Sequence, residues 1–543
     1  MTAISSATTV WARRARHHAP VATVGALSLL VAGCSIDGDP TGGGTAPFVY
    51  LSSTDVITEW DPAQAYSNEA LALPNLYETL TRYNPDTEEA EPLLAEDWEV
   101  SEDGETWTFD LAEDVTFHSG EPMTAESVQA AIERTMELDL GAAYLWDPVS
   151  SIEATDEHTV VFDLDYPAAL DLIAAANYAA FIYEIPEGAP EGPDAEDSPF
   201  EAESHGTGPY TVAEWNPGSE RELQLTAFED YWRGWEDDQI EEIEYQVVSQ
   251  PETVAQMMEG GEADFAQNLP VQLIDQLRET EDVDVIETPS WQNLFGLINT
   301  EVEPLDDPQV REAIAHGVNY DEIIEATQGA FEPSDGVIPE GLLGHNTDLD
   351  IPNYDPDRAE ELLADAGYGE ENGEILTLEL TYTEGEEDLG TIAELMQDHL
   401  SSLNIELQIE ALPWESGHWP RAQEEDPEDR QDITLMYWWP DDPQALSWFY
   451  NMFMSEDDIV FNLAYYSNPE LDELIEEVGP LAATDEEAAE DTYDQMQQIL
   501  IEDNPALFLG TTVYQRALRS EYEGYVDNPL YPNAVFAYEL TRG

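Results

Sequence analysis

Two acidic residues beside two indole rings are the strongest candidates for ligand chemistry in this sequence. They lie in the run Trp-Trp-Pro-Asp-Asp-Pro at residues 438–443, whose prolines and aspartates are typical of a turn. A carboxylate held near aromatic faces suits an ammonium group, because charge pairing and cation–π attraction act together. For most of the neighbouring aromatic residues, a place in the hydrophobic core is the better explanation. The pattern therefore predicts a site for a cationic group at this turn.

Several kinds of catalysis are excluded by residues that the chain lacks. All 15 basic residues are arginine, so neither a P-loop lysine nor a Schiff-base lysine is available. There is no Gly-x-Ser-x-Gly nucleophile elbow and no His-Glu-x-x-His zinc motif. With 120 acidic residues, no catalytic carboxylate pair can be singled out. We therefore predict a chain without catalytic residues, cofactor or metal site.

The charge of the chain points to an acidic surface and to unusual surroundings. The formal net charge is −105, which would repel nucleic acid and destabilise a compact state through self-repulsion. Salt relieves that repulsion, since the screening length falls to about 3 Å at about 1 M salt. Hydrophobic residues make up 42% of the chain and aromatic residues 10%, too many for a disordered acidic chain. We predict a folded protein with an acidic shell suited to high salt, with an alkaline habitat as the alternative.

The N-terminal residues have the features of an export signal. Three arginines at 13–16 precede the apolar run 21–30, and Val-Ala-Gly at 31–33 stands directly before Cys34. The apolar run is about half as long as the ~20 residues of a membrane-spanning helix, which indicates a cleaved signal. The residues around Cys34 resemble the lipobox of bacterial lipoproteins, in which this cysteine is lipidated. A plain cleaved signal with an incidental cysteine is the alternative.

The remaining chain shows mixed helix and strand patterns, with no further apolar run long enough to span a membrane. About 510 mature residues exceed the ~250–300 that one core supports, so two or three domains are expected. Period-two and helical patterns indicate an α/β protein. The expected strands cover 48–51, 106–111, 159–164, 222–227, 245–248, 375–382, 405–409 and 506–509. The expected helices run from Pro62 to Thr81, from Thr124, over 253–260, from Asp307, and over 355–367, 389–403, 469–478 and 486–502.

A series of short strings, in order along nearly the whole mature chain, is similar to one family. The strings include Asn-Leu-Tyr-Glu-Thr-Leu at 75–80, Leu-Ala-Glu-Asp-Trp at 94–98, Phe-His-Ser-Gly at 117–120, Gly-Thr-Gly-Pro-Tyr at 206–210 and Tyr-Ser-Asn-Pro-Glu-Leu-Asp at 466–472. They resemble the peptide-binding class (family 5) of ABC-transporter solute-binding proteins, the dipeptide, oligopeptide and nickel family. Any one string alone would be weak, and their order makes the resemblance specific.

The resemblance implies a two-lobed periplasmic-binding-protein-like fold (type II, cluster C) with an extra inserted small domain. The implied division is a signal peptide at 1–33, a flexible linker at 34–46, lobe I at 47–75, 206–297 and 509–543, inserted domain II at 76–205, and lobe III at 298–508. The lobes would close on a solute and deliver it to a membrane permease with separate ATPase subunits. The implied protein is a monomer, held by its lipid on the outer face of the cytoplasmic membrane.

The resemblance also implies roles for particular residues. Asp441 aligns best with the aspartate that pairs with the α-ammonium of bound peptides, and Asp442 is the near alternative because this segment is short. Trp414 matches a pocket tryptophan, and Trp438 and Trp439 are further candidates for the pocket wall.

Four residues after Tyr382 are acidic where dipeptide binders tend to carry a basic group: Glu384, Glu386, Glu387 and Asp388. This departure favours longer peptides or a cationic ligand. A nickel chelate, haem, glutathione or a sugar are alternative ligands. A secreted hydrolase or an adhesive lipoprotein are alternatives of another class.

Overall fold

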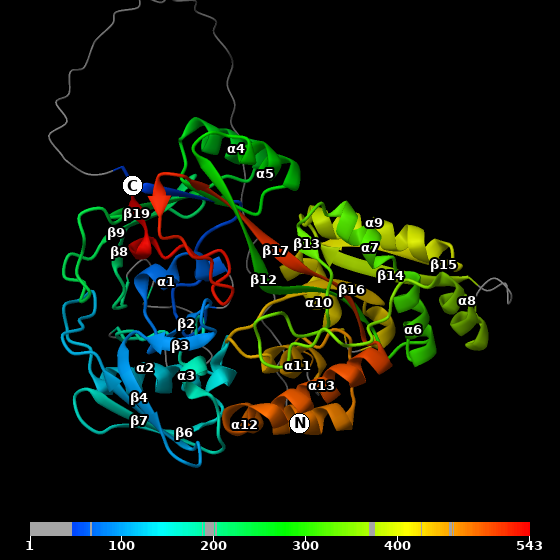
Figure 1. Ribbon diagram of the computed structural model, residues 1–543, viewed down its shortest axis with the longest axis horizontal. Coiled ribbons are helices and arrows are strands. Elements are labelled where there is room, and N and C mark those ends of the chain that lie inside the picture. The colour runs from blue at the N-terminus through cyan, green and yellow to red at the C-terminus, as the bar shows by residue number, and fades with distance from the viewer. Residues whose placement is uncertain are drawn as a thin grey trace, which may run out of the picture. The chain divides into compact units, whose positions relative to one another are not determined.

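The computed structural model describes residues 46–543 apart from 66–67, 187, 190–199, 201–203, 369–374, 425, 456–458 and 460 (Figure 1). The chain divides into two compact units, Met1–Gly44 and Thr45–Gly543, and the description concerns the second. The predicted signal peptide, Cys34 and nearly all of the predicted linker lie outside the described residues. Among the described helices, none combines the length and the apolar character needed to cross a membrane.

A large mixed sheet forms the framework of the described part (Figure 1). Two long antiparallel strands, β12 and β17, occupy its middle, and β13 pairs with β17 off the main path. The predicted boundary between residues 508 and 509 falls inside β17. In sheet order the strands are β15 (Ile405–Leu412), β14 (Leu376–Thr383), β16 (Ile433–Trp438), β12 (Val283–Ile298), β17 (Ala506–Arg519), β11 (Phe265–Gln267), β1 (Phe48–Ser52), β10 (Glu242–Val247), β9 (Arg221–Ala227) and β8 (Tyr210–Trp215), with β13 (Phe331–Glu332) at the side.

The segment predicted as an inserted domain contains a separate antiparallel sheet with its own hydrophobic core. Its strands are β4 (Ala95–Val100), β5 (Thr106–Leu111), β7 (Thr159–Leu164) and β6 (Val149–Ala154). Helix α2 (Ala125–Leu138) contributes Val128 and Ile132 to this core beside Phe109 and Phe162 of the sheet. Two small antiparallel pairs complete the strands, β2 (Thr81–Asn84) with β3 (Glu89–Pro92) and β18 (Tyr522–Glu523) with β19 (Thr541–Arg542).

The helices connect and cover these sheets. They are α1 (Leu73–Leu76), α2, α3 (Leu170–Ile173), α4 (Pro251–Gly260), α5 (Val271–Arg278), α6 (Pro308–Gly317), α7 (Tyr320–Ala326), α8 (Pro356–Asp365), α9 (Glu387–Ser401), α10 (Trp419–Ala422), α11 (Leu446–Phe453), α12 (Pro469–Thr484) and α13 (Glu486–Asp503). Single turns of other helix types lie at Asn68–Leu71, Ala143–Trp146, Trp414–His418, Pro427–Asp429 and Ala537–Glu539.

The helix starts predicted from capping residues are confirmed. The Thr124 side chain accepts a hydrogen bond from the Ser127 N–H at 3.4 Å and caps α2. Asp307 and Asp355 cap α6 and α8 in the same way, and each precedes a proline at the first helical positions. The predicted β-α-β unit is also present, since β14 and β15 pair in parallel around α9.

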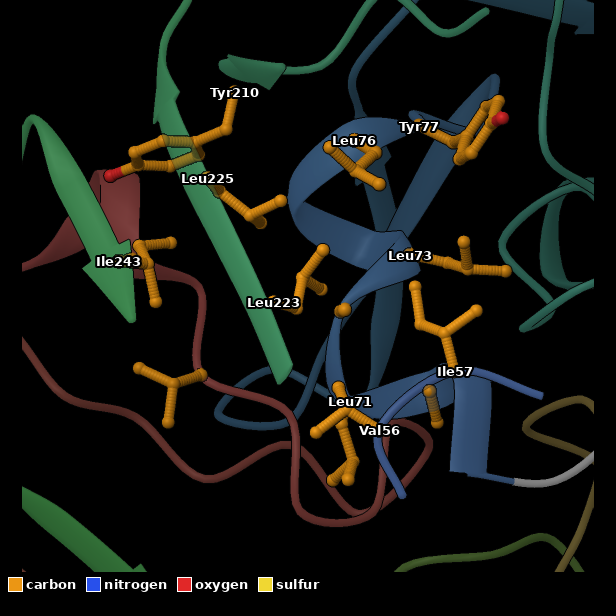
Figure 2. Packing of buried hydrophobic residues seen from close by; sticks show 14 of the residues in the cluster. Val56, Ile57, Leu71, Leu73, Leu76, Tyr77, Tyr210, Leu223, Leu225 and Ile243 are labelled. Carbon is orange, nitrogen blue, oxygen red and sulfur yellow. The ribbon is translucent and has the colours of Figure 1, made fainter. Parts of the chain in front are cut away.

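The predicted helix from Pro62 to Thr81 is wrong. Among the described residues of this range only two short helical pieces occur, Asn68–Leu71 and α1, and β2 begins at Thr81. Pro74 allows a new helix start but not the interior of a long helix. Every residue from 70 to 81 is buried, so the apolar spacing reflects burial on all sides and not one helix face. Figure 2 shows this segment beside the strands that carry Leu223 and Leu225, with Leu73 on its other side near Ile57, and all of these residues belong to one hydrophobic core.

Candidate functional site

The turn predicted to bind a cationic group follows β16 and leads into α11. Strand β16 pairs with β14 in parallel and with β12 antiparallel, which places Trp438 opposite Asn293. Trp438 is buried and its ring lies 5.2 Å from that of Phe461, whereas Trp439 is half-buried. The two adjacent indoles therefore have different environments. Trp438 belongs to a hydrophobic core and Trp439 lies at a cavity.

That cavity has a volume of about 160 Å³. Trp439 contributes an indole to its wall, and the other lining residues come from segments far apart in sequence. They are Ser53, Thr54, Ala70, Leu71, Tyr178, Gln267, Asn268, Gln292, Tyr514, Pro532 and Asn533. The wall therefore combines the ends of β1 and β11, parts of β12 and β17, and the C-terminal segment.

Asp441 is held by the segment predicted as the inserted domain. The Tyr144 hydroxyl donates a hydrogen bond to Asp441 Oδ2 at 2.6 Å, and the Asn177 N–H donates to the Asp441 carbonyl oxygen at 3.2 Å. The Asn451 side chain donates to the Tyr144 hydroxyl at 3.1 Å, and the rings of Tyr144 and Tyr450 stack 5.7 Å apart. Burial raises the pKa of Asp441, and the hydrogen bond from Tyr144 partly opposes the rise.

Asp442 lies deeper than Asp441. It is 3% exposed, and its Oδ2 accepts a hydrogen bond from the Gln444 side chain. Burial and the neighbouring Asp441 carboxylate raise the pKa of Asp442 to about 7, and the hydrogen bond from Gln444 opposes that rise. This arrangement favours a cation or a proton at the pair.

Trp414 belongs to a row of aromatic rings and is not among the described lining residues of the cavity. Its ring is 5.7 Å from Trp419, which lies 5.4 Å from Phe461, the ring that also contacts Trp438. Of the five predicted ligand-binding residues, Trp439 lines the cavity, and Asp441, Asp442, Trp414 and Trp438 are not among its described lining residues. The roles of these four toward a ligand stay predictions.

The other cavity residues and Tyr144 were not predicted from the sequence. Gln267 stands at the end of the short strand β11, and Asn533 follows it by more than 250 positions. Amide and hydroxyl side chains of this kind form no motif, and no spacing rule joins such distant segments. Gln267 is the last residue of β11, and ligands of α/β sheets commonly bind beyond the carboxyl ends of strands, which is a local signal that could have drawn attention to it.

Metal chemistry finds no support in the described residues, which contain no group of three or more His, Cys, Asp or Glu side chains placed to hold a metal ion.

Comparison with known proteins decides the family. Bacterial extracellular solute-binding proteins, family 5 Middle, match residues 89–459 of the chain. The chain belongs to this family. The family predicted from the short strings is therefore confirmed, and with it the coarse function of an extracellular solute-binding protein.

Relatives of this family member are similar over most of its length. The probable D,D-dipeptide-binding periplasmic protein DdpA of Escherichia coli (strain K12) is 27% identical over 481 residues, which cover 87% of this chain and 89% of the relative. The glutathione-binding protein GsiB of the same strain is 25% identical over 543 residues, which cover 97% and 99%.

A solved structure of DppA from Helicobacter pylori in complex with peptide STSA superimposes with a TM-score of 0.76 at 21% identity. The match covers 92% of this chain and 98% of that one. The predicted fold class, α/β and two-lobed like the periplasmic binding proteins, is confirmed by this likeness.

Proposed function

We propose that this protein is the extracytoplasmic solute-binding component of an ABC importer and that its ligands are peptides. The observation that carries the proposal is the cavity that joins Trp439 to amide and hydroxyl side chains of β11, β12, β17 and the C-terminal segment. Amide groups recognise the N–H and C=O groups of a peptide main chain, and an indole packs against its side chains. Two comparisons support peptides as the ligands. One relative, DdpA, is named a probable D,D-dipeptide-binding protein, and the structure of DppA with the similar fold contains peptide STSA.

The proposed mechanism is capture without chemical change. The ligand lies between lobe I (47–75, 206–297 and 509–543) and lobe III (298–508), and domain II (76–205) lies beside them. A ligand that contacts both lobes stabilises the closed form by its differential affinity. A membrane permease then receives the solute, and separate subunits hydrolyse ATP.

The α-ammonium of the peptide pairs with Asp441, or with Asp442 in the alternative register. The test compares peptides with a free amine against the same peptides N-acetylated, by calorimetry at about 1 M salt. Asp441→Ala should weaken free-amine peptides by about 2–5 kcal/mol and change N-acetylated peptides little, because only the former carry the charge that is left unpaired. Asp237→Ala serves as the control, because Asp237 is exposed and its substitution removes the same negative charge away from the turn at 438–443. Equal losses for both peptide forms would contradict the amine role.

The identity of the ligand has a direct test of its own. Mass spectrometry of small molecules that co-purify with the protein should find peptides. A relative named for glutathione makes that tripeptide the second candidate. A nickel chelate, haem or a sugar bound in place of any peptide would overturn the proposal, and turnover of peptide or glycan would favour a hydrolase.

The protein is exported and held by a lipid on Cys34 at the outer face of the cytoplasmic membrane, as a monomer with an acidic shell suited to high salt. Two or more acyl chains anchor a protein stably, whereas one binds only marginally. Cys34→Ser should therefore move the protein from the membrane fraction to the medium. Retention of the variant in the membrane would contradict the anchor.

A further inference from the structure

The wall of the cavity at Trp439 carries no charged side chain among its described residues. Charged residues make up 25% of the chain, and most of them are acidic. A wall built only from amides, hydroxyls, aromatic rings and small apolar groups therefore departs from the composition of the rest of the molecule.

Three polar atoms of this wall lack a hydrogen-bond partner within the described part of the chain. They are the Tyr514 hydroxyl, Gln267 Oε1 and Asn533 Oδ1. Tyr514 is 5% exposed, and buried polar groups in folded proteins are ordinarily hydrogen-bonded. A molecule bound in the cavity would supply partners to all three atoms.

Gln267 offers an acceptor to that molecule. Its Oε1 atom is buried and has no hydrogen-bond partner among the described residues, and Gln267 lines the cavity. The neighbouring Asn533 uses its carbonyl oxygen to accept from the Tyr50 hydroxyl at 2.7 Å, which leaves its side-chain oxygen as a second acceptor. The ligand must present N–H or O–H groups to this part of the wall.

A neutral buried pair supports the wall from the sheet. The Arg516 guanidinium lies 4.2 Å from the centre of the Tyr514 ring and 3.4 Å from Asp527 Oδ2, and its side chain is 1% exposed. Arg516 stands opposite Gln267 in the pairing of β17 with β11. Because Arg516 is matched by Asp527, it fixes Tyr514 without giving the cavity a net charge.

We propose that this cavity is a specificity pocket that takes one uncharged, hydrogen-bond-donating residue of the ligand and rejects a carboxylate or an ammonium group. The proposal rests on the peptide function above. The volume of about 160 Å³ is smaller than the roughly 300–1,000 Å³ of sites that enclose a drug-sized molecule, so only a part of the ligand enters. A charge placed there would lose its water without gaining an opposite charge, whereas a neutral amide satisfies the three free polar atoms. Charged groups of the ligand must then lie outside this pocket.

The test measures the affinity of the whole mature protein for a series of tripeptides by calorimetry. In this series Gln, Glu or Lys is placed at the first, second or third position of the tripeptide. Gln and Glu have nearly the same shape, so their difference reports charge alone. At one position Gln should bind at least about tenfold more tightly than both Glu and Lys, and at other positions the three should differ less.

Two variants then place a carboxylate on the wall without changing its shape. Asn533→Asp and Gln267→Glu should each invert the order at that one position, so that Lys binds more tightly than Gln. Gln423→Glu is the matched control, because Gln423 is exposed and is not a lining residue of the cavity, and it should leave the order unchanged. Thermal unfolding of each variant checks that the fold is kept.

The outcomes separate the two proposals. The specificity pocket would be refuted if tripeptides bind but no position favours Gln over Glu and Lys. It would also be refuted if the two variants keep the native order of affinities for Gln, Glu and Lys. Either result would leave the proposed peptide function unaffected. A protein that binds no peptide while it binds another solute would overturn both.

Discussion

Removal of Arg134 should be among the most damaging single changes to stability in this protein. Arg134 on α2 donates to both oxygens of Asp61, from Nη1 to Oδ1 at 2.9 Å and from Nη2 to Oδ2 at 2.5 Å. The side chains are 8% and 0% exposed, and the guanidinium also lies 5.1 Å from the ring of Phe200. The pair therefore connects the N-terminal segment to the predicted inserted domain in a setting that water and salt hardly reach.

The size of the effect follows from the charge that remains. Arg134→Met keeps the apolar stem and leaves the Asp61 carboxylate buried without a counter-charge, which costs about 3–5 kcal/mol. Asp61→Asn should lose a comparable amount for the converse reason. The double variant should lose less than the sum, with a coupling of about 0.5–3 kcal/mol, because neither charge is then left alone.

The assay is urea unfolding followed by circular dichroism at about 0.1 M and about 1 M NaCl, with hydrogen exchange along α2 to locate the change. Arg278→Met is the matched control, since Arg278 and Glu287 form a 2.8 Å pair that is 42% and 47% exposed. That surface pair should contribute about 1 kcal/mol or less and should fade at high salt. A loss from Arg134→Met no larger than the control, or one that vanishes at high salt, would refute the reasoning.

Three further predictions concern charge and packing. The unfolding midpoint of the native chain should rise from about 0.1 M to about 1 M NaCl, because salt screens the self-repulsion of a formal charge of −105, and a flat or falling midpoint would contradict this. The pKa of Asp442 is raised to about 7 from an ordinary value of 3.8, so its contribution to stability is greatest below about pH 4 and falls as the pH rises to about 7. Asp442→Asn should flatten that part of a denaturation profile, and an unchanged slope would count against the shift. Gly206→Ala should impair folding, because a Cβ there would lie 2.0 Å from the Leu76 carbonyl oxygen, and normal solubility and melting of the variant would show that the close approach relaxes.

The parts of the fold that sequence reasoning predicted correctly depend on residues a few positions apart. The β-α-β unit at 375–409 appears as β14, α9 and β15, and its two strands pair in parallel from Leu376 with Ile405 to Thr383 with Leu412. The strand at 106–111 was predicted from alternation, and it and the strand predicted at 159–164 have those bounds in the structure. Caps and period-two patterns act locally, so local sequence contains them.

The long strands β12 and β17 were missed or shortened for a physical reason. The pattern predicted only residues 506–509 of β17, because Gly510, Thr511 and Thr512 interrupt the apolar run, and the structure continues the strand through them to Arg519. Strand β12 contains Pro289, and its pairing with β17 shifts register between Pro289 and Asn293. Prolines and bulges interrupt the alternation of apolar and polar residues by which a strand is recognised in sequence. The strand forms nonetheless, because it pairs with a strand more than 200 residues away.

The site was predictable only in part. The turn after Trp438 drew attention because rings and carboxylates are adjacent in sequence, and the structure does place Trp439 at a cavity. Asp441, in contrast, is not among the described lining residues of that cavity. Its carboxylate accepts a hydrogen bond from Tyr144, a residue of the segment predicted as the inserted domain. No local pattern contains such a partner, since contacts between distant segments arise only when the chain folds.

The distribution of the few arginines explains how an acidic chain can keep a neutral pocket. Arg134 and Arg516 are buried against Asp61 and Asp527, and Arg311 is buried with hydrogen bonds to the main-chain carbonyl oxygens of Asp503 and Leu305. Cations placed inside the fold hold segments together where salt does not screen them, while the predicted acidic shell is expected to depend on salt for its stability. A pocket that binds through amides and rings is likewise insensitive to screening. The recognition of an uncharged ligand residue can therefore persist under conditions that weaken every ion pair at the surface.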